Sequence, residues 1–303
     1  MRITNNMVTN SILGELQQLE TQQSSLQTEV SSGLAVSQPS DDPAAFGQVV
    51  QLEDQSNETA QFNKNASQAL DLANASYGGL DSLQQIYDRA SQLGALGNGT
   101  LGNASSSTYA DELDQLIQQA VQVANTKLNN TYIYAGTAVS QPPFTTTANG
   151  SGQIGSVAYT TAPGGDQQAS IALSPTSSVS PSTSGATNQG IAGFINNMIS
   201  LRDALSAGDS SGISTASAAL ASSDDLITSA VAENGAVQTR IQADQTQQQA
   251  YATELNSLIS GDTNADLSQT IVKLNQAQVA YQASLQTAAS VMHLSLLNYV
   301  NLQ

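Results

Sequence analysis

Apolar residues recur at alternating spacings of four and three near both ends of the chain. Toward the C-terminus the stripe runs through Leu267, Ile271, Leu274, Gln278, Tyr281, Leu285, Ala288, Met292 and Ser295. Near the N-terminus it runs through Ile12, Leu16, Leu19, Gln23, Leu26 and Val30. This spacing is typical of a coiled-coil seam. A long helix with one narrow stripe cannot bury that stripe against itself, so each end requires a partner helix.

The ends of these two helices carry recognisable signals. The N-terminal helix is expected to run from Val8 to Gly33, which can take the left-handed conformation that closes a helix. The next helix is expected to begin with Asp42 as its cap and Pro43 at its first position, with Asp41 near the positive helix end.

The C-terminal helix is expected to start at a capping pair formed by Thr263 and Asp266. From Asp266 to Val300 it would span roughly 50 Å.

Helical spacing also dominates the middle of the chain. After Pro43 it passes through Phe62, Ala66, Ala69, Ala73, Ser76, Leu80, Leu83, Tyr87 and Ala90. The Gly-, Asn- and Ser-rich stretch 94–107 predicts a loop. A third helix is then expected to start at a capping pair, Thr108 and Asp111, and to use Leu113, Leu116, Ala120, Val123 and Leu128.

Two further helices are predicted in the second half. The first uses Ile191, Phe194, Ile195, Met198, Leu201 and Leu205 and ends at Gly208. The second runs from about 213 to 260. It places Asn234, Asp244 and Gln248 at seam positions, which favours a fixed register over maximal stability.

Between these helical parts the pattern changes to that of strands. Residues 132–134 (Tyr-Ile-Tyr) predict a strand. Residues 155–160 and 168–173 flank Pro163–Asp166, which predicts a β-hairpin. The Ser-rich run 174–184 predicts a loop or a flexible edge.

The predicted fold is therefore mainly α, a long antiparallel helical or coiled-coil rod built from both chain ends. We expect a terminal assembly region (1–42 and 261–303), a helical rod domain (43–131 and 188–260) and a small β-rich insertion (132–187).

Composition narrows the classes of partner. The chain has 24 acidic and 7 basic residues, a net charge of −17, and no Cys. Nucleic acid is not expected, because phosphate binding depends on clustered Lys and Arg. The absence of Cys excludes disulfides and thiolate metal sites. The first sixteen residues do not form a Sec-type signal, and the absence of a long apolar window argues against membrane insertion.

Three local patterns suggest chemistry, and each has a simpler explanation. Gly97–Gly102 spells a dinucleotide fingerprint, but it follows a predicted helix rather than a strand. Asp262, Asn264 and Asp266 begin like a calcium loop, but Leu267 and Lys273 stand where Gly and Glu are needed. The single histidine, His293, cannot form a two-histidine zinc site. We therefore expect no cofactor, no metal and no enzymatic activity.

Several motifs resemble the bacterial flagellin superfamily. The N-terminal signature is carried by Ser31-Ser32-Gly33 followed by Pro39–Ala44, including Asp41, Asp42 and Pro43. C-terminal segments at 276–278, 282–285 and 294–300 also resemble the superfamily. Within it, residues 130–137 with Gly136, then Pro142, Pro143 and Phe144, are similar to the hook-associated protein 3 family of hook–filament junction proteins.

The resemblance implies a structural subunit of the bacterial flagellum. Such a subunit is secreted by the type III export apparatus with a flagellar export chaperone, and it lies in the extracellular flagellum at the hook–filament junction. Its implied partners are other copies of itself, the first hook-associated protein and flagellin. Its assembly interface would be the two terminal stripes. Both ends are expected to be disordered in the free subunit and to order on assembly.

Periodicity alone leaves other readings open. The stripes could equally form the core of a monomeric helical bundle. The nearest alternative function is that of flagellin, the filament subunit. A surface-binding module carried by the β insertion is a further alternative, and in the junction reading the insertion is expected to be removable without loss of motility.

Overall fold

The chain is mainly helical, with three small hairpins inserted between the third and fourth helices. The computed structural model describes residues 5–98, 103–160 and 167–300. The helices are α1 (Asn5–Ser32), α2 (Pro43–Gly97), α3 (Asn103–Ala124), α4 (Gly185–Ala207), α5 (Ser210–Thr263) and α6 (Leu267–Val300). The strands are β1 (Lys127–Leu128), β2 (Thr131–Tyr132), β3 (Phe144–Ala148), β4 (Ile154–Tyr159), β5 (Ile171–Ala172) and β6 (Ser178–Val179). The prediction of a mainly α fold with a small β insertion is confirmed.

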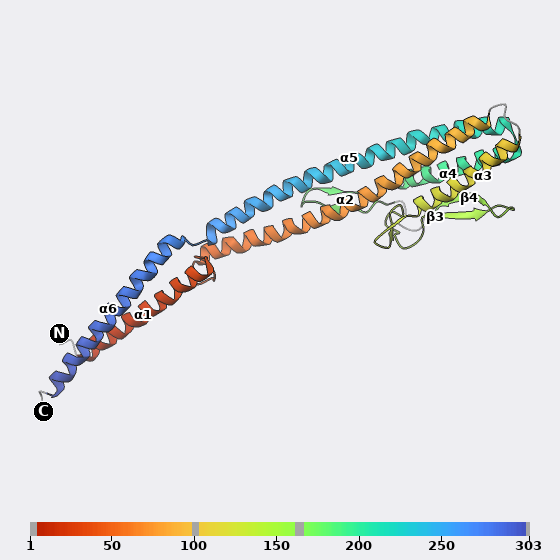
Figure 1. Ribbon diagram of the computed structural model, residues 1–303. Coiled ribbons are helices and arrows are strands. Elements are labelled where there is room, and N and C mark those ends of the chain that lie inside the picture. The colour runs from red at the N-terminus through yellow and green to blue at the C-terminus, as the bar shows by residue number, and fades with distance from the viewer. Residues whose placement is uncertain (1–4, 99–102, 161–166, 301–303) are drawn as a thin grey trace. The chain divides into compact units, whose positions relative to one another are not determined.

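The chain divides into two compact units. The first combines the two chain ends, Met1–Asn57 and Ala252–Gln303, and the second is Glu58–Tyr251. In the first unit α1 and α6 lie side by side (Figure 1). The partner helix that each terminal stripe requires is thus supplied within one subunit.

The connections at the base of α1 and α6 are joined by backbone hydrogen bonds. Leu34 and Asn264 form an isolated antiparallel bridge. The N–H of Ala265 donates to the carbonyl of Gly33 at 2.9 Å, and the N–H of Ala35 donates to that of Thr263 at 2.7 Å. Gly33 has φ +75°, as its expected role in closing the first helix requires. Both helix breaks therefore occur at the same level and are fixed to each other.

The predicted cap of α2 is correct, and the capping pair predicted for α6 is wrong. Oδ1 of Asp42 accepts from the N–H groups of Ala44 and Ala45, so Asp42 caps α2. Asp266 alone caps α6, accepting from the N–H groups of Ser268 and Gln269. Thr263 is instead the last residue of α5, and its hydroxyl donates to the Ile259 carbonyl. Helix α5 is therefore longer than predicted, and it includes Thr263, whose hydroxyl we had assigned to the start of α6.

Asp41 also differs from its predicted role. Its carboxylate accepts from the backbone N–H groups of Ser37 and Gln38, both at 3.0 Å, and from the Ser37 hydroxyl. It therefore orders the connection between α1 and α2 rather than the start of α2.

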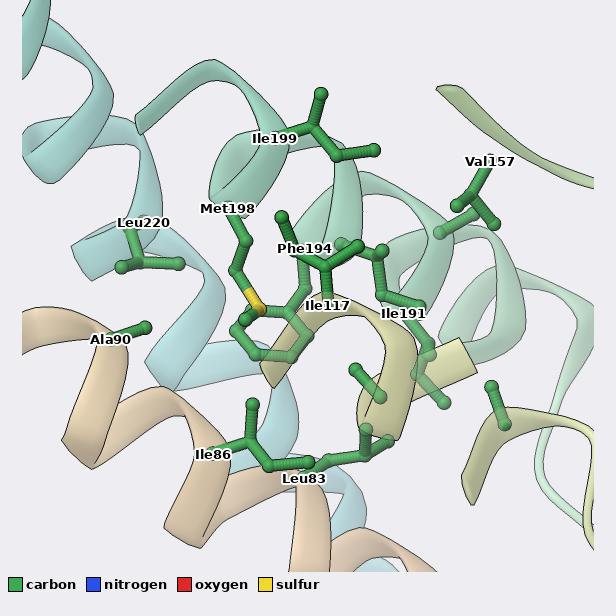
Figure 2. Close-up of a cluster of buried hydrophobic side chains, with 14 of the residues drawn as sticks. Leu83, Ile86, Ala90, Ile117, Val157, Ile191, Phe194, Met198, Ile199 and Leu220 are labelled. Atoms are coloured by element: carbon green, nitrogen blue, oxygen red, sulfur yellow. The ribbon is translucent and has the colours of Figure 1, made fainter. Parts of the chain in front are cut away.

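The second unit is organised around a core to which α2, α3, α4 and α5 all contribute. Figure 2 shows Leu83, Ile86 and Ala90 of α2 around Ile117 of α3, with Ile191, Phe194 and Met198 of α4 and Leu220 of α5. Every apolar α4 position predicted from spacing is buried there. Gly208, with φ +64°, ends α4 as predicted.

The loop predicted at 94–107 is shorter than expected. Helix α2 continues through Gly94 to Gly97, and α3 already begins at Asn103, ahead of Thr108 and Asp111. A Cβ at Gly94 would meet Leu201, and a Cβ at Gly97 would overlap Leu205. These glycines serve the packing of α4 onto the α2 backbone and do not break the helix. The loop was predicted because this stretch is rich in Gly, Asn and Ser.

The strand pairing also differs from the prediction. Strand β4 pairs with β3, and β5 pairs with β6, both antiparallel. The predicted hairpin between 155–160 and 168–173 is therefore wrong, and its turn at Pro163–Asp166 lies outside the described residues. The predicted strand at 132–134 shortens to β2, which pairs with β1 across Asn129 and Asn130, both of positive φ.

The β5–β6 hairpin bonds to two of the three polar seam residues of α5, Asp244 and Gln248. The Ser177 hydroxyl donates to Asp244 at 3.3 Å, and the Gln248 amide donates to the Leu173 carbonyl at 3.2 Å. Leu173 is fully buried in a cluster with three alanines of α2 and with Ile241. The run 174–184, predicted as a loop or a flexible edge, includes the short strand β6, and Val179 of this strand is buried against the helices.

The β insertion shares the core of the second unit. Ile133, Tyr134, Phe144, Val157 and Tyr159 belong to the same buried cluster as the helices. Removing residues 144–186, the segment expected to be dispensable, would take Phe144, Val157 and Tyr159 out of that core. The expectation that the whole insertion can be removed harmlessly therefore lacks a physical basis.

Candidate assembly interface

The α1 side of the terminal pair follows the predicted stripe. Leu26 is buried, and the other predicted apolar positions, Ile12, Leu16, Leu19 and Val30, are half-buried. The α1 residues named as a seam therefore point toward α6. Their incomplete burial leaves part of each side chain open to a further contact.

The α6 side uses a different stripe from the predicted one. Its inward positions are Thr270, Leu274, Ala277, Tyr281, Ser284, Ala288 and Val291, which are buried or half-buried. Only Leu274, Tyr281 and Ala288 belong to both sets. Leu267, Ile271, Leu285 and Met292 remain 44–46% exposed. On a helix, the residues three and four positions after a given residue both lie near its face. The prediction chose the larger residue four positions after Leu274, Tyr281 and Ala288, whereas α6 faces α1 with the residue three positions after each of them: Ala277, Ser284 and Val291.

Helix α6 thus carries two adjacent stripes. The inner one is made largely of small side chains and packs on α1. The outer one consists of exposed large apolar side chains: Ile271, Val272, Val279, Leu285 and Met292. Exposed Met7 and Leu13 add apolar surface on α1. Large exposed apolar patches on a protein surface are typical of interaction sites.

The packing between α1 and α6 is incomplete near the chain ends. A small apolar cavity there is lined by Ile12, Leu13, Leu16, Ala288, Val291 and Met292. Small inner residues such as Ala288 cannot fill the space between two helices. Burial within one subunit therefore leaves the terminal pair weakly packed compared with the second unit, where the large side chains are fully buried.

Charge is distributed unevenly over the terminal pair. Lys273 is the only Asp, Glu, Lys or Arg side chain of α6, whereas α1 carries Glu15, Glu20 and Glu29. Glu29 accepts a hydrogen bond from the buried Thr270 hydroxyl at 2.8 Å, which fixes the register of the pair. The outer α6 stripe is thus flanked by few charges and can approach another apolar surface at little electrostatic cost.

The motif residues of the second unit pack around one end of α3. Gly136 has φ +57°, and Pro143 accepts a hydrogen bond from the N–H of Thr160 at 2.7 Å. Phe144 is buried, and its backbone N–H and carbonyl both bond to the side chain of Asn125. Pro142 is exposed. These residues build the fold of the insertion and, except for Pro142, are buried within the second unit.

Sequence reasoning missed three buried polar residues that hold this region together. Tyr134 donates its hydroxyl to the Ser76 carbonyl of α2 at 2.9 Å. Asn188 donates to the Tyr134 carbonyl, and Arg202 donates to Asp114 and to the Ile154 carbonyl, each at 2.8 Å. A lone polar residue at a seam spacing gives no signal of such a partner far away in the sequence.

The described residues hold no group of three or more side chains that could bind a metal ion. None of their helices is long and apolar enough to cross a membrane. Most of the dinucleotide-like run, Gly99–Gly102, lies outside the described residues, and so does the side chain of His293. Asp262 lies in α5, and Asp266 caps α6.

Comparison with known proteins agrees with this arrangement. Residues 3–139 match the family described as the bacterial flagellin N-terminal helical region. The flagellar filament 41 kDa core protein of Borreliella burgdorferi is 26% identical over 120 residues, covering 39% of this chain and 36% of that protein. The chain therefore spans about a third of the length of this curated relative.

Solved structures share the fold over a larger part of the chain. A Vibrio parahaemolyticus protein assigned as a flagellar hook-associated protein has a TM-score of 0.64 at 14% identity, over 74% of this chain and all of that one. Bacillus cereus FlgL has a TM-score of 0.57 at 17% identity, over 69% of this chain and 98% of its own. Residues 3–139 of this chain are thus similar to the bacterial flagellin N-terminal helical region, and the chain has the fold of these two solved proteins.

Proposed function

We propose that this chain is a structural subunit of the bacterial flagellum that forms the junction between hook and filament. It acts outside the cell, after export through the type III apparatus, and it catalyses no reaction. One observation carries the proposal: α1 and α6 pair through a thin seam and leave a second apolar stripe on α6 exposed. Such a surface is suited to assembly with other helices.

The outer stripe supplies a physical driving force for assembly. Burying a large apolar side chain contributes about 1.5 to 3 kcal/mol relative to leaving it exposed. The five side chains of the outer stripe and Leu267 are exposed on α6, and the predicted positions Ile12, Leu16, Leu19 and Val30 of α1 are only half-buried. Contact with other copies of the chain would bury the apolar surface of these side chains that is still exposed.

The position at the junction is supported by the middle of the chain. Residues 130–144 resemble hook-associated protein 3, and in the structure Tyr134 and Phe144 of this segment are buried in the core of the second unit. Two solved structures with this fold are a hook-associated protein and FlgL. The partners that follow are the first hook-associated protein on the hook side, flagellin on the filament side, and a flagellar export chaperone before assembly.

Electron microscopy of flagella from a strain lacking this gene tests the proposal. The junction role predicts bare hooks, with filament protein shed into the medium and filaments restored by the intact gene. A filament of normal length on the deletion strain would contradict it.

A second candidate is the filament subunit itself. The match to the Borreliella burgdorferi filament core protein favours this alternative. Purified protein decides between the two: a filament subunit elongates alone into long filaments, whereas a junction subunit adds only to hooks that carry the first hook-associated protein.

A further inference from the structure

The two outer edges of the β3–β4 hairpin are each closed by one asparagine side chain. On β4, the Val157 N–H donates to Oδ1 of Asn196 at 2.9 Å, and Nδ2 of Asn196 donates to the Val157 carbonyl at 2.8 Å. On β3, Asn125 does the same for Phe144 at 3.1 and 2.9 Å. A carboxamide presents one acceptor and one donor side by side, so each asparagine stands in for a residue of a neighbouring strand.

On β3, only the backbone groups of the first residue, Phe144, are bonded to an asparagine side chain. Backbone groups of a strand point to alternate sides, so the N–H and carbonyl of Thr146 face the same outer edge as those of Phe144. Thr146 is exposed, and none of the described residues bonds to these two outward groups. A register shift between Thr147 and Ala148 ends the regular edge. The open edge is therefore short and centred on Thr146.

This edge lacks the protection that strands at the edge of a sheet normally carry. Natural edges are blunted by charged side chains, especially Lys, or by proline. Strand β3 contains neither, and no Asp, Glu, Lys or Arg occurs anywhere from Leu128 to Gly165. Its three consecutive threonines are β-branched and suited to pairing with another strand. The local sequence thus favours strand addition at this edge.

We propose that the β3 edge is a self-association site, at which β3 of a second copy pairs antiparallel across Thr146. A two-fold pairing lets the N–H and carbonyl of Thr146 in each copy bond to those of the other. The charge of the chain favours a second copy as the binding partner at this edge. Each copy carries a net charge of −17, so two copies approach with least repulsion where both are neutral, and this hairpin is neutral on both.

The contact is small and is therefore weak in dilute solution. It forms when copies are held close to one another or are highly concentrated. The inference goes beyond the junction role, because it concerns the purified subunit alone and requires no hook or filament.

Single-cysteine variants test this geometry, since the chain has no cysteine of its own. In the proposed pair the two Thr146 Cα atoms lie about 5.5 Å apart, as in a hydrogen-bonded antiparallel pair, which is within disulfide range. Thr146→Cys is expected to form a disulfide-linked dimer at least tenfold faster than Ser156→Cys, which lies at another exposed position, on β4. Equal rates for the two variants would overturn the proposal.

A charge placed on the edge gives an independent readout. Thr146→Lys adds one positive charge per copy at the centre of the pair, whereas Thr146→Val keeps the backbone groups and the β-branch. In sedimentation velocity at rising protein concentration, the Lys variant is expected to lose self-association that wild type and the Val variant retain. Thermal unfolding confirms that each variant is folded. Undiminished association of the Lys variant, or none in wild type, would contradict the proposal.

Discussion

Tyr134 lies against Gly79 so closely that its hydroxyl oxygen occupies the space a Cβ on that glycine would take. The same hydroxyl donates to the Ser76 carbonyl at 2.9 Å, one turn earlier on α2. The tyrosine of the family-like segment 130–137 is thus fixed on a helix more than fifty positions earlier in the chain. A glycine within a long helix makes this contact possible.

The neighbouring glycines of α2 provide a matched test of that contact. Gly79→Ala is expected to lower the free energy of unfolding by about 1–3 kcal/mol, because the added methyl displaces Tyr134 from a packed core. Gly78→Ala, which meets nothing within 4 Å, is expected to raise it by about 0.5–1 kcal/mol through helix propensity. Urea unfolding measures both. Changes of the same sign and size would refute the account of Gly79.

The ion pair of Arg202 with Asp114 is a second buried link in this unit. The Arg202 side chain is 1% exposed and that of Asp114 10%, and their nearest charged atoms lie 2.8 Å apart. Arg202→Met leaves Asp114 uncompensated and removes the donor to the Ile154 carbonyl. It is expected to cost about 3–5 kcal/mol of unfolding free energy.

The second carboxylate beside Arg202 supplies the control for this test. Asp203 also pairs with Arg202, but its side chain is 59% exposed, so Asp203→Asn is expected to cost less than about 1 kcal/mol. Equal losses in Arg202→Met and Asp203→Asn would show that burial of the pair with Asp114 is unimportant.

A pH effect is expected at the connection between α1 and α2. The backbone N–H of Ser37 is the main cause that lowers the pKa of the Asp41 carboxyl below its ordinary value of 3.8, with the Gln38 N–H adding to it. Because the pKa is lower in the folded state, Asp41 stabilises the fold above pH 3.8. That stabilisation is lost as the pH falls below 3.8 and through the folded pKa.

NMR titration of the Asp41 carboxyl carbon checks this directly. We expect a midpoint below 3.8 in the wild-type protein and a return toward the ordinary value in Ser37→Pro, which lacks the N–H donor. A wild-type midpoint at or above 3.8 would contradict the assigned hydrogen bonds.

The two stripes of α6 are expected to respond differently to substitution. Leu285→Gln, on the exposed outer stripe, should change the unfolding free energy by no more than about 0.5 kcal/mol, as for other surface substitutions. The same change should prevent the subunit from adding to hooks. Ala288→Gln, on the inner stripe, should separate α1 from α6 by overpacking. Circular dichroism and a hook-binding assay measure the two effects.

A polar position nearby on α6 serves as the control. Gln282→Ser changes an exposed residue outside both stripes and is expected to leave stability and hook binding unchanged. If Leu285→Gln binds hooks as well as Gln282→Ser does, the outer stripe is not an assembly surface.

Much of the helical fold could be predicted because its signals are local. The four-three spacing located α2, α4 and α5, and single residues such as Gly33, Asp42 and Gly208 marked ends that the structure retains. What spacing could not supply was the choice between adjacent stripes. In α6 we predicted that the large residues Leu285 and Met292 face the partner helix, whereas α1 packs on the smaller Ser284 and Val291.

The β insertion was harder to predict because its pairing depends on contacts distant in sequence. Strand β4 is held by Asn196 and Arg202 of α4, and β3 by Asn125 at the end of α3. The polar seam residues Asp244 and Gln248 bind the β5–β6 hairpin, and helical periodicity contains no information about such a partner. Glycines that admit a neighbouring side chain, such as Gly94 and Gly97, likewise look the same as glycines in a loop.

The central claim is that the terminal pair of helices is completed by other subunits. Amide hydrogen exchange, compared between the soluble subunit and the subunit assembled on hooks, tests it most directly. The account predicts fast exchange around Leu16 and Leu285 in the soluble subunit, slow exchange around Phe194, and strong protection of all three after assembly. Strong protection at Leu16 and Leu285 already in the soluble subunit, with no further change on assembly, would contradict it.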